Sequence, residues 1–351
     1  LFYKNLEEEV NQSGFLINTN KNRFLCKDNR QTVTGLTVNN KVNVSRDFYL
    51  KTRAMAHCLY NRGEFSIDGE KASINQLEGR FSFINRLDKN QNINKFKMLQ
   101  SSKKTHNFFS KLVLNSREKE YQKFLFYKYF WRNSKPLIMT EGKTDILYIK
   151  AALKKYYKEY PELIEKIEKD KFNYKISFFK RSDRLKFLFG FVNDGADDIL
   201  NIFHYYIDKP QSKLKHNKSF NYCAYFKNKL DIPFKNPIII LYDNEGKNKP
   251  LHKSINDVCT LLIKGKEQDD LRSRKQDSLK KALNDSMPVA QNIIENIYFL
   301  TNPRLKDNDT EIEDLLTNIT SHLVIDGRSF NKDGGKNNFG KNTLAQYVNK
   351  N

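Results

Sequence analysis

Two groups of acidic side chains are spaced so that they could bind one shared metal centre. Glu141 and Asp145 stand four residues apart, and Asp243 and Glu245 stand two apart. Side chains four apart are neighbours on a helix surface, and side chains two apart in an extended segment point the same way. A glycine follows Glu141 and another follows Glu245, and each permits a tight turn. The spacing therefore predicts that these carboxylates converge.

Short apolar runs come directly before both acidic groups and predict buried β-strands. Residues 136–140 lead to Glu141, and residues 236–242 lead to Asp243. Functional groups of open parallel α/β sheets gather beyond the carboxyl ends of the strands, so we expect both groups at one edge. The alternative is that these acids only cap the starts of helices, where negative charge is favourable.

The chemistry of this acidic set favours magnesium, with manganese as the alternative metal. Clustered carboxylates repel one another strongly unless divalent cations neutralise them. A ligand set of oxygens, without cysteine or histidine, suits Mg²⁺ or Mn²⁺ and not zinc. Two such ions about 4 Å apart are the usual arrangement for hydrolysing a phosphodiester. We therefore predict a metal-dependent nuclease.

The composition favours a nucleic-acid partner and argues against a membrane protein. Lys and Arg number 62 against 41 for Asp and Glu, and the resulting net charge of +21 attracts polyanions. An unspecific basic surface is the alternative. No apolar run approaches the ~20 residues that span a bilayer, and the four widely spaced cysteines fit a reducing cytoplasm. The chain starts at Leu1 without a signal peptide or an initiator Met, so we expect the later part of a longer protein.

The sequence pattern changes near residue 130 and predicts two domains, residues 1–130 and 131–351. The first is expected to be mainly helical after an early β-hairpin. Gly79, inside one of its helices, predicts the close approach of a second backbone. The expected hairpin covers 32–44, and the expected helices cover 46–59, 77–87 and 107–130.

The second domain is expected to be α/β, with a mostly parallel sheet flanked by helices. Short apolar runs alternate with amphipathic stretches, which is typical of parallel strands joined by right-handed crossovers. Charged runs at 209–221 and 264–280 predict surface loops. The expected strands are 136–140, 174–179, 236–242 and 296–300, and the expected helices are 144–157, 194–206, 252–263 and 278–284.

Basic side chains on the predicted helices of the first domain are candidate contacts to a phosphate backbone. A hairpin followed by basic helices can clamp a duplex through its phosphates without reading its sequence. Ordinary surface charge is the alternative for each of them. The candidates are Arg46, Lys51, Arg53, Arg80 and Arg86.

The acidic motifs resemble those of a known domain family. Glu141-Gly142-Lys143-Thr144-Asp145 after one strand, with Asp243-Asn244-Glu245 after a later one, is similar to the Toprim domain, close to the overcoming-lysogenization-defect branch of Toprim nucleases. The resemblance implies a Rossmann-like fold and metal ligands at Glu141, Asp145, Asp243 and Glu245. This chain carries Asp243-x-Glu245 where the family usually has Asp-x-Asp, which preserves charge but alters the metal geometry.

Later segments extend the same resemblance. Glu311-Ile312-Glu313-Asp314 resembles the family's later acidic positions and implies a further metal ligand at Glu313. Gly340-Lys341, before a last helix, resembles the family's Gly-Lys pair and implies a catalytic Lys341 near the scissile phosphate. The alternatives are a solvated helix face for the two glutamates and ordinary surface charge for Lys341. Residues 193–198 resemble a glycine-containing family turn, whose three aspartates are expected to be helix-start acids instead of ligands.

The first domain resembles part of a second family. Residues 31–39, 43–44 and 53–57 are similar to the segment after the palm of bacterial retron reverse transcriptases, and residues 77–84 resemble the thumb that follows it. The resemblance implies that residues 1–130 are the end of the palm and the thumb. The polymerase's paired-aspartate motif is absent, so this chain alone cannot polymerise.

Together the two resemblances cover most of the chain and imply a retron reverse transcriptase fused to a nuclease. They imply a toxic effector of antiphage defence, controlled by the polymerase bound to its template RNA and RNA-linked DNA (msDNA). The implied substrate is tRNA or other nucleic acid, RNA or DNA, and the implied assembly is a homo-oligomer. The alternative function is a non-catalytic module that binds msDNA or RNA and keeps a vestigial acidic site.

Overall fold

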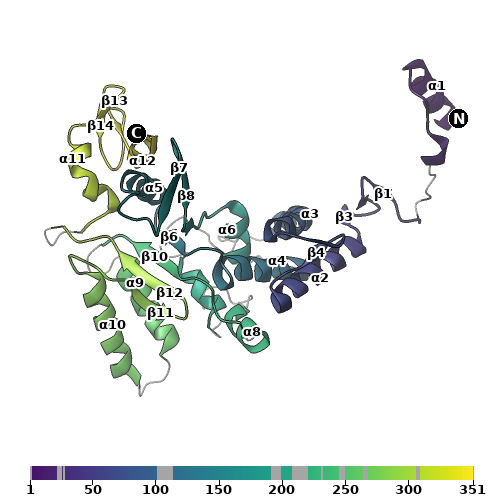
Figure 1. Cartoon of the computed structure of the whole chain (residues 1–351). Coiled ribbons are helices and arrows are strands. Elements are labelled where there is room, and N and C mark those ends of the chain that lie inside the picture. Colours follow the sequence, from purple (N-terminus) through teal and green to yellow (C-terminus); the bar gives the residue numbers. More distant parts are fainter. Residues whose placement is uncertain are drawn as a thin grey trace.

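A five-stranded sheet forms the centre of the computed structural model (Figure 1). For residues 89–100, 200 and 250 the structure describes the backbone alone. The described residues are 2–21, 26, 28–100, 114–190, 199–207, 220–230, 232–244, 250–263, 268–305 and 309–350.

The sheet confirms the expected α/β architecture with mostly parallel strands. Its spatial order is β11-β12-β10-β6-β9, in which β12, β10, β6 and β9 are parallel and the edge strand β11 is antiparallel to β12. The strand bounds are β6 Leu137–Thr140, β9 Ser177–Phe178, β10 Ile238–Tyr242, β11 Gln291–Ile294 and β12 Ile297–Thr301.

The central strand β10 lies between β6 and β12 and is apolar throughout. Ile238, Ile240 and Tyr242 are fully buried, as expected for β-branched and aromatic residues in a strand covered by helices. Ile238 pairs with Leu137, and the register continues to the pair of Leu241 with Thr140. Strands β6 and β10 therefore end at nearly the same level of the sheet.

Helices and one hairpin connect these strands. The expected helices 144–157 and 252–263 are confirmed, within two residues at each end. The connecting elements are, in chain order, α5 (Asp145–Lys155), β7 (Ile164–Glu168), β8 (Lys171–Tyr174), α6 (Asp183–Phe189), η4 (Leu200–Tyr205), α8 (Tyr222–Lys229), α9 (Pro250–Leu262) and α10 (Asp269–Leu283).

Helix α10 corrects the expectation of a loop over 264–280. Leu279 and Leu283 are buried and stand one helical turn apart, so they form an apolar stripe that packs toward α9, β11 and β12. The dense charge of the other positions hid that stripe in the sequence. Residues 264–267, and 209–219 of the other predicted loop, lie outside the described residues.

The first 131 residues are mainly helical, as predicted. Helices α2 and α3 confirm the expected helices at 46–59 and 77–87. No helix among the described residues combines the length and the apolar character needed to cross a membrane. The elements are α1 (Phe2–Gln12), η1 (Thr19–Lys21), β1 (Thr32–Val33), β2 (Leu36–Thr37), β3 (Asn43–Val44), α2 (Arg46–Arg62), β4 (Ser66–Ile67), β5 (Glu70–Lys71), α3 (Ile74–Gln100), α4 (Ser116–Phe126) and the π-helical turn η3 (Tyr127–Trp131).

Three local expectations in this segment need correction. The hairpin is a three-stranded meander, because Thr34 and Gly35 take positive φ angles of 48° and 82° and turn the chain between β1 and β2. Helix α4 starts at Ser116 because Asn115 caps it with Glu118 in a capping box. Within the described part of the chain, no atom beyond the backbone of its own helix lies within 4 Å of a Cβ placed on Gly79, so no described second backbone approaches there.

A small C-terminal unit packs against α5. Tyr148 of α5 is buried with Ile312, Phe339, Leu344 and Ala345 in one apolar cluster. This packing fixes the start of α12 beside α5. The unit comprises η6 (Ile312–Leu316), α11 (Thr317–Thr320), β13 (Val324–Ile325), β14 (Arg328–Phe330), β15 (Asn338–Phe339) and α12 (Lys341–Lys350).

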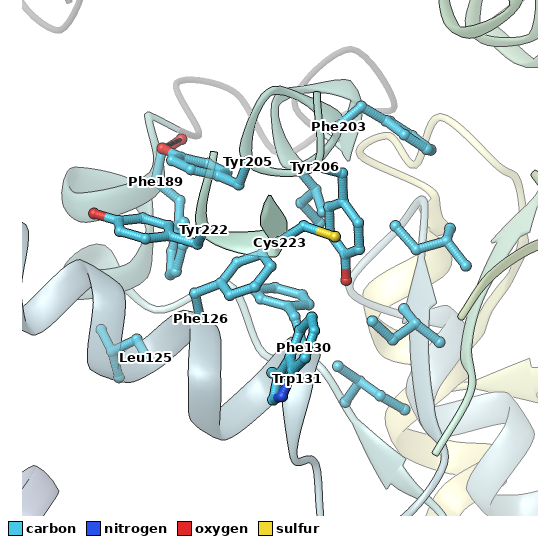
Figure 2. Close-up of a cluster of buried hydrophobic side chains, with 14 of the residues drawn as sticks. Leu125, Phe126, Phe130, Trp131, Phe189, Phe203, Tyr205, Tyr206, Tyr222 and Cys223 are labelled. Atoms are coloured by element: carbon cyan, nitrogen blue, oxygen red, sulfur yellow. Dashed lines mark hydrogen bonds between the residues drawn. The ribbon is translucent and has the colours of Figure 1, made fainter. Parts of the chain in front are cut away.

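The main core is rich in aromatic rings and includes residues from both sides of position 130 (Figure 2). The Phe126 ring lies 5.6 Å from that of Phe130 and 5.3 Å from that of Tyr206. Phe130 also lies edge-on to Phe189, 5.7 Å away. Helices α2 to α4 thus share a core with the sheet and its helices, while the domain boundary near 130 stays a prediction.

Replacement of Phe130 by alanine tests this shared core. The fully buried ring contacts Phe126, Phe179 and Phe189, so its loss should lower the free energy of unfolding by about 3–5 kcal/mol. Urea denaturation measures the change. Phe2→Ala is the control, because that ring is 82% exposed and its removal should change stability by less than about 0.5 kcal/mol. Equal effects of the two variants would contradict this account of the core.

Candidate metal centre

Glu141 and Asp243 lie at the same edge of the sheet. Glu141 follows β6, and its backbone N–H donates to the carbonyl oxygen of Leu241 in β10 at 3.2 Å. Asp243 comes two residues after Leu241, directly beyond the end of β10. The two acids therefore follow neighbouring parallel strands at their carboxyl ends, where the sheet rule places a functional site.

Asp145 starts α5 and closes the turn after Glu141. Its carboxylate is buried, and Oδ2 accepts a hydrogen bond of 2.8 Å from the backbone N–H of Gly142. A Cβ on Gly142 would come within 2.7 Å of Asp145 Oδ1. Glycine is therefore required for this carboxylate to reach its position. Asp145 can close the turn before α5 and still belong to the candidate site.

Asp243 is oriented by Asn302, which the sequence analysis missed. The Asn302 side-chain amide donates to Asp243 Oδ1 at 2.8 Å, and the Asn302 backbone N–H donates to Tyr242 at 3.1 Å. Asn302 is buried directly after β12. The rule that located Asp243 at a strand end would have located Asn302 too.

A short β-bridge brings the later acidic segment to the same edge. The backbone of Asn244 exchanges hydrogen bonds of 2.9 and 2.8 Å with Thr310, and Glu311 and Glu313 follow Thr310. Glu313 is only 3% exposed, and its Oε1 makes no hydrogen bond within the described residues. The alternative of a solvated helix face is therefore wrong for Glu313.

Lys341 reaches this acidic segment from the start of α12. Its Nζ lies 3.1 Å from Glu311 Oε2 and 3.6 Å from Glu313 Oε2. The Tyr148 hydroxyl of α5 donates to the Lys341 carbonyl oxygen at 3.1 Å and holds the helix start in place. Lys332, another residue that the sequence analysis missed, lies 2.8 Å from Glu311 Oε2.

The electrostatics show that these groups interact. Burial, reinforced by the negative charges of Asp145, Glu141, Glu311 and Glu313, raises the pKa of Asp243 to about 8. Burial also raises the pKa of Asp145 and of Glu313. The pKa of Lys341 is raised because the nearby glutamates and Asp243 outweigh its burial. The site has an excess of negative charge that a cation would relieve.

The donors suit a hard divalent cation, although a complete ligand set is not assembled among the described residues. Carboxylate oxygens are the ligands that magnesium prefers, and Glu313 presents a buried oxygen, Oε1, that accepts no hydrogen bond from the described residues. No three His, Cys, Asp or Glu side chains of the described residues come close enough together to form a metal-ligand group. Glu245, the remaining predicted ligand, lies outside the described residues.

The predicted phosphate contacts lie elsewhere, on α2 and α3, on the opposite side of the molecule from α12 (Figure 1). Arg46, Arg53 and Arg86 are exposed, and Lys51 forms an ion pair of 3.1 Å with Asp47. Arg80 donates to Thr52 at 3.1 Å and stacks on a phenylalanine ring of α2. Residues 191–198, with three predicted helix-start aspartates, lie outside the described residues.

Comparisons with known proteins add no family to this picture. No protein-family model matches the chain, and no solved structure matches it.

Gly142→Ala should disturb the site from a position that is not itself acidic. The added Cβ must push the Asp145 carboxylate away and break a helix-start hydrogen bond, which costs about 0.5–2 kcal/mol of stability. Gly79→Ala is the matched control, because that helical position has open space and alanine stabilises helix interiors by roughly 0.5–1 kcal/mol. Chemical denaturation should give opposite signs for the two variants, and a shared sign would contradict the geometry.

Asp243→Asn should change how the stability of the metal-free protein depends on pH. The unfolded carboxyl group loses its proton near pH 4, whereas the folded group keeps it until about pH 8. The stability contribution of Asp243 is thus complete below about pH 4 and is lost as the pH rises through about 8. With a chelator present, the melting temperature of Asp243→Asn minus that of the wild type should increase from pH 5 to pH 9. A constant difference would contradict the raised pKa.

Proposed function

We propose that the protein hydrolyses phosphodiester bonds of nucleic acid with a bound divalent metal, and that residues 131–351 form a Toprim nuclease domain. One observation carries the proposal: Glu141 and Asp243 follow neighbouring parallel strands, and burial, reinforced by the surrounding carboxylates, raises the pKa of Asp243 to about 8. Acids that only cap helix starts have no reason to be crowded together, whereas acids that bind one cation must lie close together despite their repulsion.

Each side chain has a defined part in this proposal. Glu141, Asp145, Asp243 and Glu313 would hold Mg²⁺ or Mn²⁺, together with Glu245 as predicted from the sequence. A bound metal lowers the pKa of water and stabilises charge on a phosphate. Asn302 fixes the orientation of Asp243 through its 2.8 Å hydrogen bond. Lys341 would leave its glutamate partners for the substrate phosphate. There it would stabilise the negative charge that develops on the phosphate during cleavage.

We further propose that the chain is the end of a retron reverse transcriptase joined to this nuclease. The support is the resemblance of residues 31–39, 43–44 and 53–57 to the segment after the palm and of residues 77–84 to the thumb, together with the net charge of +21. Helices α2 and α3 would hold msDNA and its template RNA through their exposed basic side chains. The bound polymerase would restrain a nuclease effector of antiphage defence, whose substrate is tRNA or DNA and which acts as a homo-oligomer.

A non-catalytic binding module is the competing function, and one observation favours it. The carboxylates of the described residues do not come together as a ready metal-ligand group, and Lys341 already neutralises part of the charge of Glu311 and Glu313. In this alternative the acidic site is vestigial, and the basic surfaces still bind nucleic acid.

Metal-dependent cleavage separates the two functions. The purified protein is incubated with labelled tRNA, single-stranded DNA and duplex DNA, with Mg²⁺ or Mn²⁺ and with a chelator. We expect cleavage of at least one substrate only with metal, and a loss of at least about 100-fold in Asp243→Asn and Glu141→Gln, because removing even a ligand's supporting group costs 10- to 100-fold.

Asp170→Asn is the matched control for this experiment. It makes the same substitution at an exposed turn between β7 and β8, where the φ of 64° suits asparagine. This variant should cleave like the wild type. Binding of the same substrates without metal-dependent cleavage would support the non-catalytic alternative, and cleavage that survives in both site variants would exclude this site as the nuclease.

A further inference from the structure

A cleft between α9 and α10 opens beside the acidic site but contains none of its carboxylates. Its volume is about 830 Å³, which falls within the roughly 300–1,000 Å³ of ligand-binding pockets. Helix α9 follows β10, and α10 returns the chain toward β11 and β12. The cleft is therefore built from the two helices between strand β10, which ends next to Asp243, and strand β12, which ends next to Asn302.

Buried hydrogen bonds attach one end of this cleft to the acidic site. His252 at the start of α9 and Asn284 at the end of α10 lie in the cleft wall, with His252 Nε2 3.0 Å from Asn284 Nδ2. The neighbouring Leu283 carbonyl oxygen accepts a hydrogen bond of 3.2 Å from the Asn244 side chain. Asn244 directly follows Asp243, so this end of the cleft lies next to the acidic site.

The charges of the cleft are divided between its two ends. Lys253 at the start of α9 and Lys280 and Lys281 at the end of α10 line the end beside Asn244. Asp257, four residues after Lys253, and Asp277, three residues before Lys280, line the part of the cleft farther from Asn244. The cleft is positive near the acidic site and negative away from it.

Helix stability alone does not explain this arrangement of lysines. Lys280 and Lys281 are in the last turn of α10, where positive charge is favourable for the helix dipole. Lys253 is in the first turn of α9, where positive charge opposes the dipole. Neither Lys280 nor Lys281 forms an ion pair with any described residue, so their charges are available to a ligand.

We propose that the α9–α10 cleft binds the phosphodiester backbone of a nucleic-acid strand and delivers the adjacent bond to the acidic site. Lysine ammonium groups are compact point charges that bind phosphates without reading bases. Asp257 and Asp277 repel the backbone from the far end and confine it beside Asn244. That the cleft binds a phosphodiester backbone follows from the cleft residues alone, whereas its role in cleavage rests on the proposed nuclease function.

The test removes the two unpaired charges and measures binding without metal chemistry. Lys280→Gln/Lys281→Gln is combined with Asp243→Asn, and fluorescence anisotropy follows a labelled single-stranded DNA and an RNA of the same sequence in chelator at several salt concentrations. We expect affinity to fall about tenfold and the salt slope to decrease by about 1.4, because each lysine that contacts a single strand contributes about 0.7.

Three matched variants separate the cleft from general surface charge. Lys169→Gln/Lys175→Gln removes the same charge from exposed positions near the β7–β8 hairpin and should leave the salt slope nearly unchanged. Lys280→Arg/Lys281→Arg keeps the charge and should keep the slope. Asp257→Asn/Asp277→Asn removes the repulsive end and should tighten binding.

The outcomes distinguish failure of the cleft from failure of the nuclease. If the two glutamine pairs lose the same affinity, or neither loses any, the cleft proposal is overturned. If the wild type cleaves with metal but Lys280→Gln/Lys281→Gln keeps the wild-type KM, the cleft is overturned and the nuclease stands. If no metal-dependent cleavage occurs while this pair alone weakens binding in chelator, the cleft stands and the nuclease fails.

Discussion

Repulsion between carboxylates at one edge of the sheet is the constraint on which the site depends. The parallel register of β6 and β10 ends both strands at nearly the same level, so Glu141 and Asp243 lie at the same edge of the sheet. Burial removes the water that would screen them, and the proton on Asp243 persists to about pH 8. A fold that only needed stability would place apolar or neutral side chains here, and this is why we propose that the edge binds a cation.

Several polar residues around the edge support this unfavourable arrangement. Gly142 lets Asp145 close the turn after β6, Asn302 supplies an amide to Asp243, and the bridge from Asn244 to Thr310 brings Glu313 close. Lys341 supplies positive charge to Glu311 and Glu313 from a different part of the chain. These contacts come from five separate stretches of sequence, and the sheet and its C-terminal unit bring them together.

The strands and their acidic ends could be predicted because the signals are local. Apolar runs of β-branched residues before Glu141 and Asp243 define both the strand and its exit. The spatial order of the strands and the pairing of Lys332 with Glu311 depend on contacts between distant residues, and no local pattern encodes them. Only the end of helix α10 was predicted, as a helix over 278–284, because just two buried leucines interrupt the charge of this helix. The meander was missed because Thr34 is a non-glycine residue with positive φ.

The aromatic core around Phe126 and Phe130 links the basic helices mechanically to the acidic edge of the sheet. Close-packed rings have few alternative arrangements, so they transmit displacement with little loss. Helix α4 contacts α3 on one side and continues through the π-helical turn to the sheet on the other. A force that displaced α2 and α3 would therefore also displace β6, because the close-packed rings between them leave little room to absorb the movement.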